Sequence, residues 1–254
     1  MPVFRMNNQL AYYAHVPKCA GSSVETYLKD RFGTLGLVDT KYLLQPPNQR
    51  WTRSSPQHVD WQTLIRLIPA EYFSSVFAVV RHPVSRIVSA YHFQTHVEKT
   101  APTDTPFQDW LHALLEAREQ DPFVVDNHIR PQAEFMPESC DVFYLEHGLD
   151  ALIPYFDGLT GDKNGPRAMS RTNTRTKDTE KASLPVLSDH DLDLISQVYA
   201  VDFERFGYTV GEKMPKADAP VLSAEFQAEN ARAKQRADQP LNRLASRIKR
   251  KLTR

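Results

Sequence analysis

The stretch AYYAHVPKCAGSSVETYLKDRFG, residues 11–33, decides the fold class of this chain. Residues 11–16 form a short, mostly apolar run that suits a buried strand. A loop of small residues follows, and a helical pattern then runs from about Ser23 to Phe32, with Gly33 as a natural stop. One face of that helix is apolar and carries Val24, Tyr27, Leu28 and Phe32. A strand, a tight loop and a helix in this order predict the start of an α/β domain.

The same alternation continues to about residue 210. We expect helices at residues 60–68, 83–91, 106–118 and 188–206, and strands at residues 76–80 and 141–145. The sequence Thr105-Pro106-Phe107-Gln108 has the pattern of a capping box with proline at the first helical position. Together these elements predict one domain over residues 1–213, with a central, mostly parallel sheet flanked by helices.

The composition is that of an ordinary globular protein. The 254 residues are 41% hydrophobic and 24% charged, which fits one domain with a sizeable core. The formal net charge is zero, so no overall field attracts nucleic acid, and any anion site must be local. Two cysteines, Cys19 and Cys140, are too few for a disulfide framework or a four-cysteine zinc site.

The two ends of the chain carry further expectations. The N-terminus has no apolar run of signal-peptide length, and no later run would span a membrane, so we expect a cytoplasmic protein. A chain trimmed of an anchor would look the same. Residues 214–254 form a basic C-terminal tail, with a possible amphipathic helix through Leu241, Leu244, Ile248 and Leu252. Both a solvated appendage and docking on an anionic membrane, glycan or partner fit this tail.

The loop between the first strand and helix has the character of an anion site. Small residues at Ala20 and Gly21 let an anion approach backbone N–H groups at the positive end of a helix. Lys18 adds a positive charge, but it precedes Gly21 by three residues, so this is not a Walker A loop. A second interpretation needs no ligand, because Ser22-Ser23-Val24-Glu25 also fits a capping box.

A second strand–helix junction has similar features. Arg81 follows the strand at residues 76–80, at the edge where open α/β sheets bind ligands. Its guanidinium can hold a phosphate through two parallel N–H bonds. Ser85 and Ser89 lie four residues apart on one face of the next helix, although a surface helix with ordinary polar positions would also explain them. Two such sites indicate a ligand with two separated anionic groups.

These residues resemble a known family. Pro17-Lys18-Cys19-Ala20-Gly21-Ser22-Ser23 resembles the 5′-phosphosulfate-binding loop of sulfotransferases, and residues 80–91 (VRHPVSRIVSAY) resemble their 3′-phosphate-binding segment. The type is most similar to the carbohydrate branch that includes heparan sulfate 2-O-sulfotransferase and bacterial relatives. The likeness covers roughly residues 10–210, extends weakly through Arg130-Pro131-Gln132, and leaves the basic tail unmatched.

The resemblance implies a P-loop-like, three-layer α/β fold and 3′-phosphoadenosine 5′-phosphosulfate as co-substrate, with no metal. It implies that the donor is bound by Lys18, Cys19, Ala20, Gly21, Ser22, Ser23, Arg81 and Ser89, with Lys18 also stabilising the leaving oxygen. The acceptor would be a hydroxyl group, on a glycan by analogy with that branch. Arg171-Thr172-Asn173-Thr174 falls where family members use a later loop near the nucleotide, and we assign it no role.

The acceptor hydroxyl must lose a proton, so a base near neutral pKa is expected. His58 resembles the catalytic histidine of this branch in its position upstream of the second motif. A histidine near a helix cap is the alternative interpretation, and Glu134 is the alternative base. His15 lies in a strand and reads as structural. His92 and His96 are spaced for a metal but lack the HExxH glutamate and a third ligand.

Two other functions remain to be weighed against transfer of a sulfuryl group. A kinase-like phosphotransferase would need a Walker A loop and a magnesium carboxylate, and the sequence shows neither. A non-catalytic relative would bind nucleotide or glycan through the same loops, and it would be expected to lack residues such as Lys18 or His58.

Overall fold

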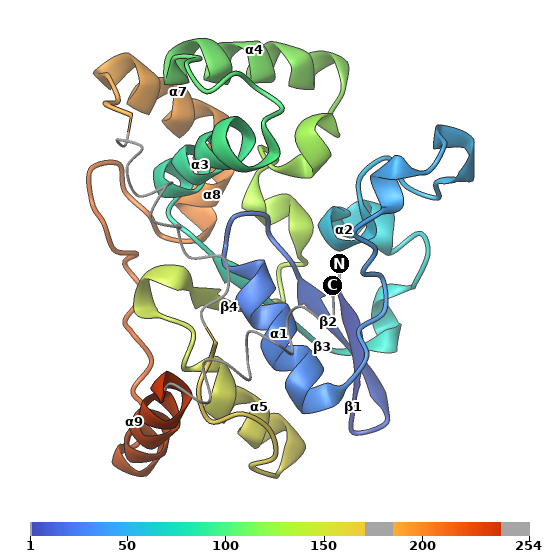
Figure 1. Cartoon of the computed structure of the whole chain (residues 1–254), viewed down its shortest axis with the longest axis vertical. Helices are drawn as coiled ribbons and strands as arrows, with labels where there is room; N and C mark the ends of the chain where they lie inside the picture. The colour runs from blue at the N-terminus through green and yellow to red at the C-terminus, as the bar shows by residue number, and fades with distance from the viewer. Residues whose placement is uncertain (1, 171–184, 240–254) are drawn as a thin grey trace.

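A central sheet organises the computed structural model of the chain, which describes residues 2–170 and 185–239. β1 (Val3–Met6) pairs antiparallel with β2 (Gln9–Ala14), and β2, β3 (Phe73–Val80) and β4 (Asp141–Tyr144) pair in parallel (Figure 1). The strand order is β1-β2-β3-β4. Asn7 and Asn8 turn β1 into β2 with φ of 50° and 61°, the left-handed pair that a two-residue hairpin favours.

Helices cover both faces of the sheet, which confirms the predicted three-layer α/β architecture. On one face, α5 (Leu152–Thr160) packs Phe156 on Phe77 with ring centroids 5.1 Å apart, and Phe32 of α1 (Gly21–Phe32) packs on Phe156 at 5.2 Å. On the other face, α2 (Trp61–Leu64) stacks Trp61 on Tyr12 at 5.7 Å. Because Tyr12 and its neighbour Tyr13 point to opposite faces of β2, both layers bury aromatic surface.

A second hydrophobic cluster lies beyond the carboxyl edge of the sheet. It joins α3 (Pro83–His92), α4 (Phe107–Gln120) and α7 (Asp189–Val198), which lie together at the top of Figure 1. Its buried members include Ile87, Tyr91, Trp110, Leu111, Ile195 and Tyr199. A π-helix, η5 (Phe93–Glu98), continues α3. The remaining short elements are α8 (Ala200–Arg205) and the 3₁₀ helices η1 (Tyr42–Leu44), η2 (Pro47–Gln49), η3 (Pro56–His58), η4 (Ala70–Tyr72), η6 (Val124–Asn127), η7 (Gln132–Phe135) and η8 (Leu145–His147).

Three predicted helices differ in extent from the structure. The helix expected at residues 60–68 is regular only over α2, where Asp60 is the N-cap and accepts from Thr63 N at 3.0 Å. The helix expected at 188–206 is divided at Tyr199, whose hydroxyl donates to Ile129 O at 2.6 Å. The capping box predicted at Thr105 is wrong, because Pro106 occupies the N-cap of α4 and no side chain caps it.

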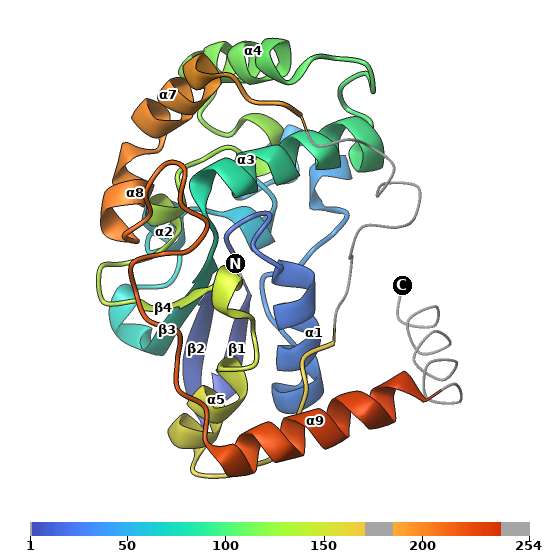
Figure 2. The same ribbon diagram turned by 90° about the vertical axis from the view of Figure 1, so that its left-hand side faces the viewer.

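Part of the predicted C-terminal tail is a helix packed on the domain. α9 (Ala224–Asp238) lies beside α5 at the end of the molecule away from α4 (Figure 2). Phe226 is buried, and Asn230 donates to Arg167 O at 2.8 Å. The amphipathic helix predicted through Leu241 lies outside the described residues. Within the described part of the chain, none of the helices has the length and apolar character needed to cross a membrane.

Candidate active site

The loop that follows β2 is bent by two residues in the left-handed region. Lys18 has φ of 69° and Ala20 has φ of 63°, and α1 begins directly afterwards at Gly21. Non-glycine residues adopt this conformation only at a cost, and such strain concentrates at functional sites. Ala20 is the N-cap and has no polar side chain to cap the helix. The capping box read at Ser22 is therefore wrong, and the positive end of α1 faces the loop.

His15 packs against the end of this loop, at the first residue of α1. A Cβ atom on Gly21 would lie 1.7 Å from His15 Nε2, so any side chain at this position would have to displace the His15 ring. His15 Nδ1 lies 2.9 Å from Glu25 Oε1. Burial lowers the pKa of His15 to about 4, although Glu25 opposes that shift. His15 is thus a neutral packing residue near pH 7, consistent with its structural interpretation from the sequence.

Lys18 is held over an aromatic ring. Its Nζ lies 3.4 Å from the centroid of Phe93, the first residue of η5. Burial lowers the pKa of Lys18 to about 8, Glu98 raises it and Arg81 lowers it further. A cation–π contact of this kind positions the ammonium group without an ion pair to a carboxylate.

Gln132 joins the loop to the end of β3. Its Oε1 accepts from Arg81 N at 2.9 Å, and its Nε2 donates to Arg81 O at 2.8 Å. The same Oε1 accepts from Cys19 Sγ at 3.4 Å. Gln132 N in turn donates to Asp202 Oδ2 at 2.9 Å. These contacts bring the two sequence-predicted anion sites together, and Arg81 Nη1 also lies 3.4 Å from Lys18 O.

A cavity of about 500 Å³ opens beside Arg81 at the carboxyl edge of the sheet. Ser85 and Lys213 line it, and so does Glu146, whose Oε1 accepts from His82 N at 2.8 Å. Ser89 lies one turn further along α3, is half-buried, and is not among the lining residues. The lining thus combines Arg81 and Lys213 with Glu146 and Glu212 near the N-terminus of α3, and it includes none of residues 18–23.

His58 is half of a hydrogen-bonded pair with an aspartate. Its Nδ1 lies 2.7 Å from Asp126 Oδ2 in η6. Asp126 also accepts from Ser55 N at 2.6 Å and from Ser55 Oγ at 2.7 Å. Burial alone would raise the pKa of Asp126, but the charge and hydrogen bond of His58 and the bonds from Ser55 lower it to about 2. Asp126 is therefore ionised at neutral pH.

The structure places His58 beside the anion loop. Its ring centroid is 5.0 Å from that of His15 and 5.1 Å from that of His128. The His128 ring is in turn 5.4 Å from Phe93, the ring under Lys18. Burial and neighbouring positive groups lower the pKa of His128 well below its usual value. The predicted base and the predicted donor loop thus belong to one cluster.

The alternative base and the alternative metal pair have other partners. Glu134 contacts Arg130 Nε at 2.5 Å and Arg118 Nη2 at 3.6 Å, so its carboxylate is engaged by two arginines. His96 Nδ1 lies 2.7 Å from Thr95 Oγ1. Among residues 2–170 and 185–239, the one group with donor atoms close enough for a metal is His58, Asp126 and His128, all within 4.8 Å. A cation there would have to replace the proton shared by His58 and Asp126.

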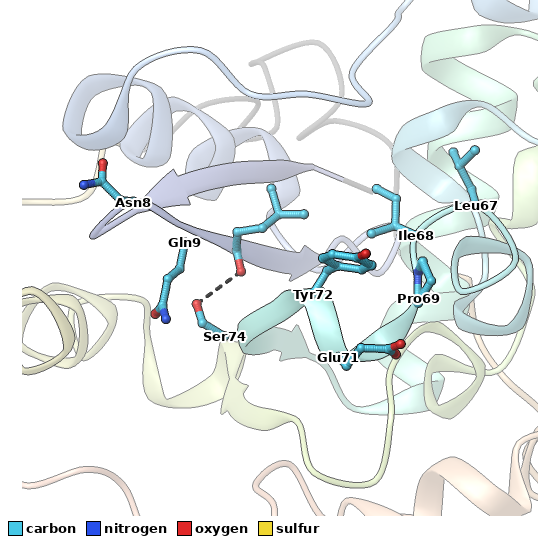
Figure 3. A pocket seen from close by; sticks show the side chains of 9 residues that line it. Asn8, Gln9, Leu67, Ile68, Pro69, Glu71, Tyr72 and Ser74 are labelled. Atoms are coloured by element: carbon cyan, nitrogen blue, oxygen red, sulfur yellow. Dashed lines mark hydrogen bonds between the residues drawn. The ribbon is translucent and has the colours of Figure 1, made fainter.

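A second cavity lies at the opposite end of the sheet. It encloses about 610 Å³ next to the β1–β2 turn, where Asn8, Gln9, Tyr72 and Ser74 surround it (Figure 3). Its lining includes Glu71 and no basic residue. The Arg81 cavity therefore offers basic side chains to an anion, and this cavity does not.

Two residues of the site were missed in the sequence. Asp126 and His128 follow no motif, and Asp126 is 68 positions from His58. The signal for Gln132 was only its place in the weak likeness at Arg130-Pro131-Gln132. The later loop at Arg171-Thr172-Asn173-Thr174 lies outside the described residues.

A mostly parallel sheet with a strand–loop–helix junction and a cation at the next strand end is a P-loop-like fold of the α/β class. A family profile described as "Sulfotransferase family" matches residues 4–209, most of the chain. The chain therefore belongs to the sulfotransferase family, whose chemistry is the transfer of sulfuryl groups. No curated protein and no solved structure matches it significantly.

Proposed function

We propose that the protein transfers a sulfuryl group from 3′-phosphoadenosine 5′-phosphosulfate to a carbohydrate hydroxyl. The observation that carries the donor assignment is the link through Gln132, which joins the Cys19 thiol to the Arg81 backbone at one edge of the sheet, while Arg81 Nη1 donates to Lys18 O. A donor with a 5′-phosphosulfate and a 3′-phosphate has two anionic ends, and these two positions supply one cationic group for each.

The described residues support roles in an in-line displacement. The acceptor oxygen forms a bond to sulfur while the bond from sulfur to the 5′-phosphate oxygen breaks, which leaves 3′-phosphoadenosine 5′-phosphate. Lys18 and the N-terminus of α1 stabilise the negative charge that develops on the leaving oxygen. His58 removes the acceptor proton. A moving sulfuryl group carries less charge than a phosphoryl group, so this proposal includes no metal.

The hydrogen-bonded His58–Asp126 pair favours an enzyme over a non-catalytic relative, because pure binding needs no base beside the donor loop. The carbohydrate acceptor rests on the likeness to that branch of the family. A cytoplasmic location is also a proposal, and the free thiols of Cys19 and Cys140 agree with a reducing compartment. Contact of the basic tail with an anionic surface stays a prediction, as does the absence of nucleic-acid binding.

The donor assignment is tested by thermal denaturation with 3′-phosphoadenosine 5′-phosphate. We expect a melting temperature several degrees higher at saturating nucleotide, because a ligand bound only to the native state stabilises it. Arg81→Ala should abolish that shift, whereas Arg66→Ala, an exposed arginine on the α2 segment, should keep it. No shift in the unaltered protein would overturn the donor assignment.

The base is tested by turnover with labelled donor against glycans, lipids, peptides and small alcohols. His58→Ala should keep the nucleotide-induced shift and lose at least about 100-fold in kcat. Transfer to alcohols or peptides but not to glycans would overturn the acceptor class alone. Unchanged turnover in His58→Ala would place the base elsewhere.

A further inference from the structure

The turn that carries Asp126 is strained over three consecutive residues. Val125, Asp126 and Asn127 have φ of 46°, 54° and 62°, all in the left-handed region. A β-branched residue such as valine is an outlier there. Strain of this kind persists only where surrounding contacts hold it, and it marks segments with a specific task.

Contacts with the His58 segment hold the turn in place. Asp126 accepts from Ser55 N and Ser55 Oγ and contacts His58 Nδ1. Asn127 Nδ2 donates to His58 O at 2.8 Å. The two carboxylate oxygens have different partners, because Oδ1 accepts from Ser55 N while Oδ2 accepts from Ser55 Oγ and faces the imidazole.

This geometry selects one tautomer of His58. An ionised carboxylate only accepts hydrogen bonds, so the proton of a neutral His58 must sit on Nδ1. The lone pair is then on Nε2, the nitrogen left to take up a proton. The other titratable groups around the ring are His15, His128, Lys18 and Glu98. Asp126 is the one carboxylate for which the described part of the chain shows a hydrogen bond to His58.

We propose that Asp126 is a positioning residue for His58. It fixes the Nδ1–H tautomer, leaves Nε2 as the base and stabilises the imidazolium formed when the acceptor hydroxyl gives up its proton. The catalytic part of this assignment rests on the proposed function, but the tautomer does not.

The variant Asp126→Asn distinguishes the roles of the two carboxylate oxygens, because it replaces one of them with an NH₂ group. Its amide oxygen can still accept from Ser55 N, while its NH₂ group faces Nδ1 and forces the proton onto Nε2. We expect kcat to fall by about 10²–10⁴-fold with the nucleotide-induced melting shift unchanged. The nitrogen-15 shifts of neutral His58 in this variant should show the Nε2–H tautomer.

Two controls define the result. Asp121→Asn changes another aspartate of the same segment, one that pairs with Arg53 at 2.9 Å, and it should keep full activity. Asp126→Glu retains the charge and should recover part of the lost kcat. If Asp126→Asn does not fold, the nitrogen-15 shifts of His58 in the unaltered protein decide, and we expect the neutral ring to carry its proton on Nδ1 and none on Nε2.

Unaltered kcat in Asp126→Asn, or an Nε2–H tautomer in the unaltered protein, would overturn the assignment. Failure of the proposed function looks different. In that case the protein transfers no sulfuryl group to any acceptor, yet the nitrogen-15 spectrum still shows the Nδ1–H tautomer of His58.

Discussion

Lys18 combines two properties that oppose each other, since it is largely buried and yet must be charged to bind an anion. Its ammonium group lies on the ring of Phe93, and its pKa is lowered to about 8 mainly by burial. Water is a better solvent for an ammonium than this site is, so the free protein loses the Lys18 proton unusually early. An anionic ligand would reverse this by favouring the charged form.

Donor affinity should therefore depend on alkaline pH. The affinity for 3′-phosphoadenosine 5′-phosphate should be flat between about pH 7 and 8, where its phosphates are fully ionised, and should weaken at higher pH by up to about tenfold per pH unit, because the protonated lysine is the binding form. Calorimetry in buffers of different ionisation enthalpy should detect proton uptake at pH 8.5. Lys18→Arg stays charged, so it should bind without this dependence. A flat affinity up to pH 9.5 would contradict the role of Lys18.

The sequence indicated Lys18 and Arg81 because they lie beside strand ends, and it indicated His58 through a resemblance to the catalytic histidine of the family. It did not show Asp126, since nothing in Val124-Val125-Asp126-Asn127 signals three left-handed residues. The energy that holds this turn comes from contacts with Ser55 and His58, far away in the sequence. Such tertiary compensation has no local pattern.

At the scale of elements, the start of α1 is fixed by packing against a neighbouring side chain. The helix begins at Gly21, two residues earlier than its apolar periodicity indicates. His15 occupies the space that a side chain at this position would need. The position of the anion loop therefore depends on a glycine–histidine contact as well as on helix propensity.

Gly21→Ala should destabilise the protein by about 1–3 kcal/mol, because the new Cβ displaces the His15 ring. Urea unfolding measures the loss, and the double variant Gly21→Ala with His15→Ala should recover part of it. Gly158→Ala is the matched control, since its Cβ would meet no atom within 4 Å in α5 and should be neutral or stabilising. Equal effects at the two glycines would contradict this account.

Periodicity predicted which elements exist better than where they end. β2, β3, β4 and α1, α3, α4 and α7 were expected, because apolar faces buried against a sheet leave a regular pattern, whereas β1 and α5 were missed. The division at Tyr199 was not expected, since the apolar pattern continues through it. There the hydroxyl of Tyr199 reaches Ile129 O, a contact that periodicity does not encode.

At the scale of the whole molecule, a buried charge cluster connects distant parts of the chain. Arg31 of α1 contacts Asp157 of α5 at 2.7 Å, and Asp157 contacts Arg167 at 2.8 Å. Arg167 reaches Glu229 of α9 at 2.9 Å. In this cluster the opposite charges form ion pairs, whereas Lys18 and Arg81 lie at the other end of the sheet. A net charge of zero is compatible with a cationic site for this reason.

Phe226 should contribute much of the free energy that holds α9 against the rest of the domain. It is buried, and the Arg167 guanidinium lies 5.3 Å from its ring centroid. Phe226→Ala should lower the free energy of unfolding by about 3 kcal/mol, because the lost burial is not replaced. The loss should be smaller if α9 detaches from the domain instead. Hydrogen exchange of the α9 amides and urea unfolding measure the two outcomes. The exposed Gln235→Ala should change neither, and protection of α9 equal to that of the unaltered protein would contradict the prediction.

The hydrogen bond from Cys19 to Gln132 has a consequence for chemical labelling. The Cys19 thiol is fully buried, and burial raises its pKa to about 12, so it carries almost no thiolate in the folded protein. An alkylating reagent can reach it only when the segment opens. The rate of Cys19 alkylation, compared with that of the partly exposed Cys140, therefore measures how often the donor loop opens. A ligand bound to the loop would lower the rate of Cys19 alkylation.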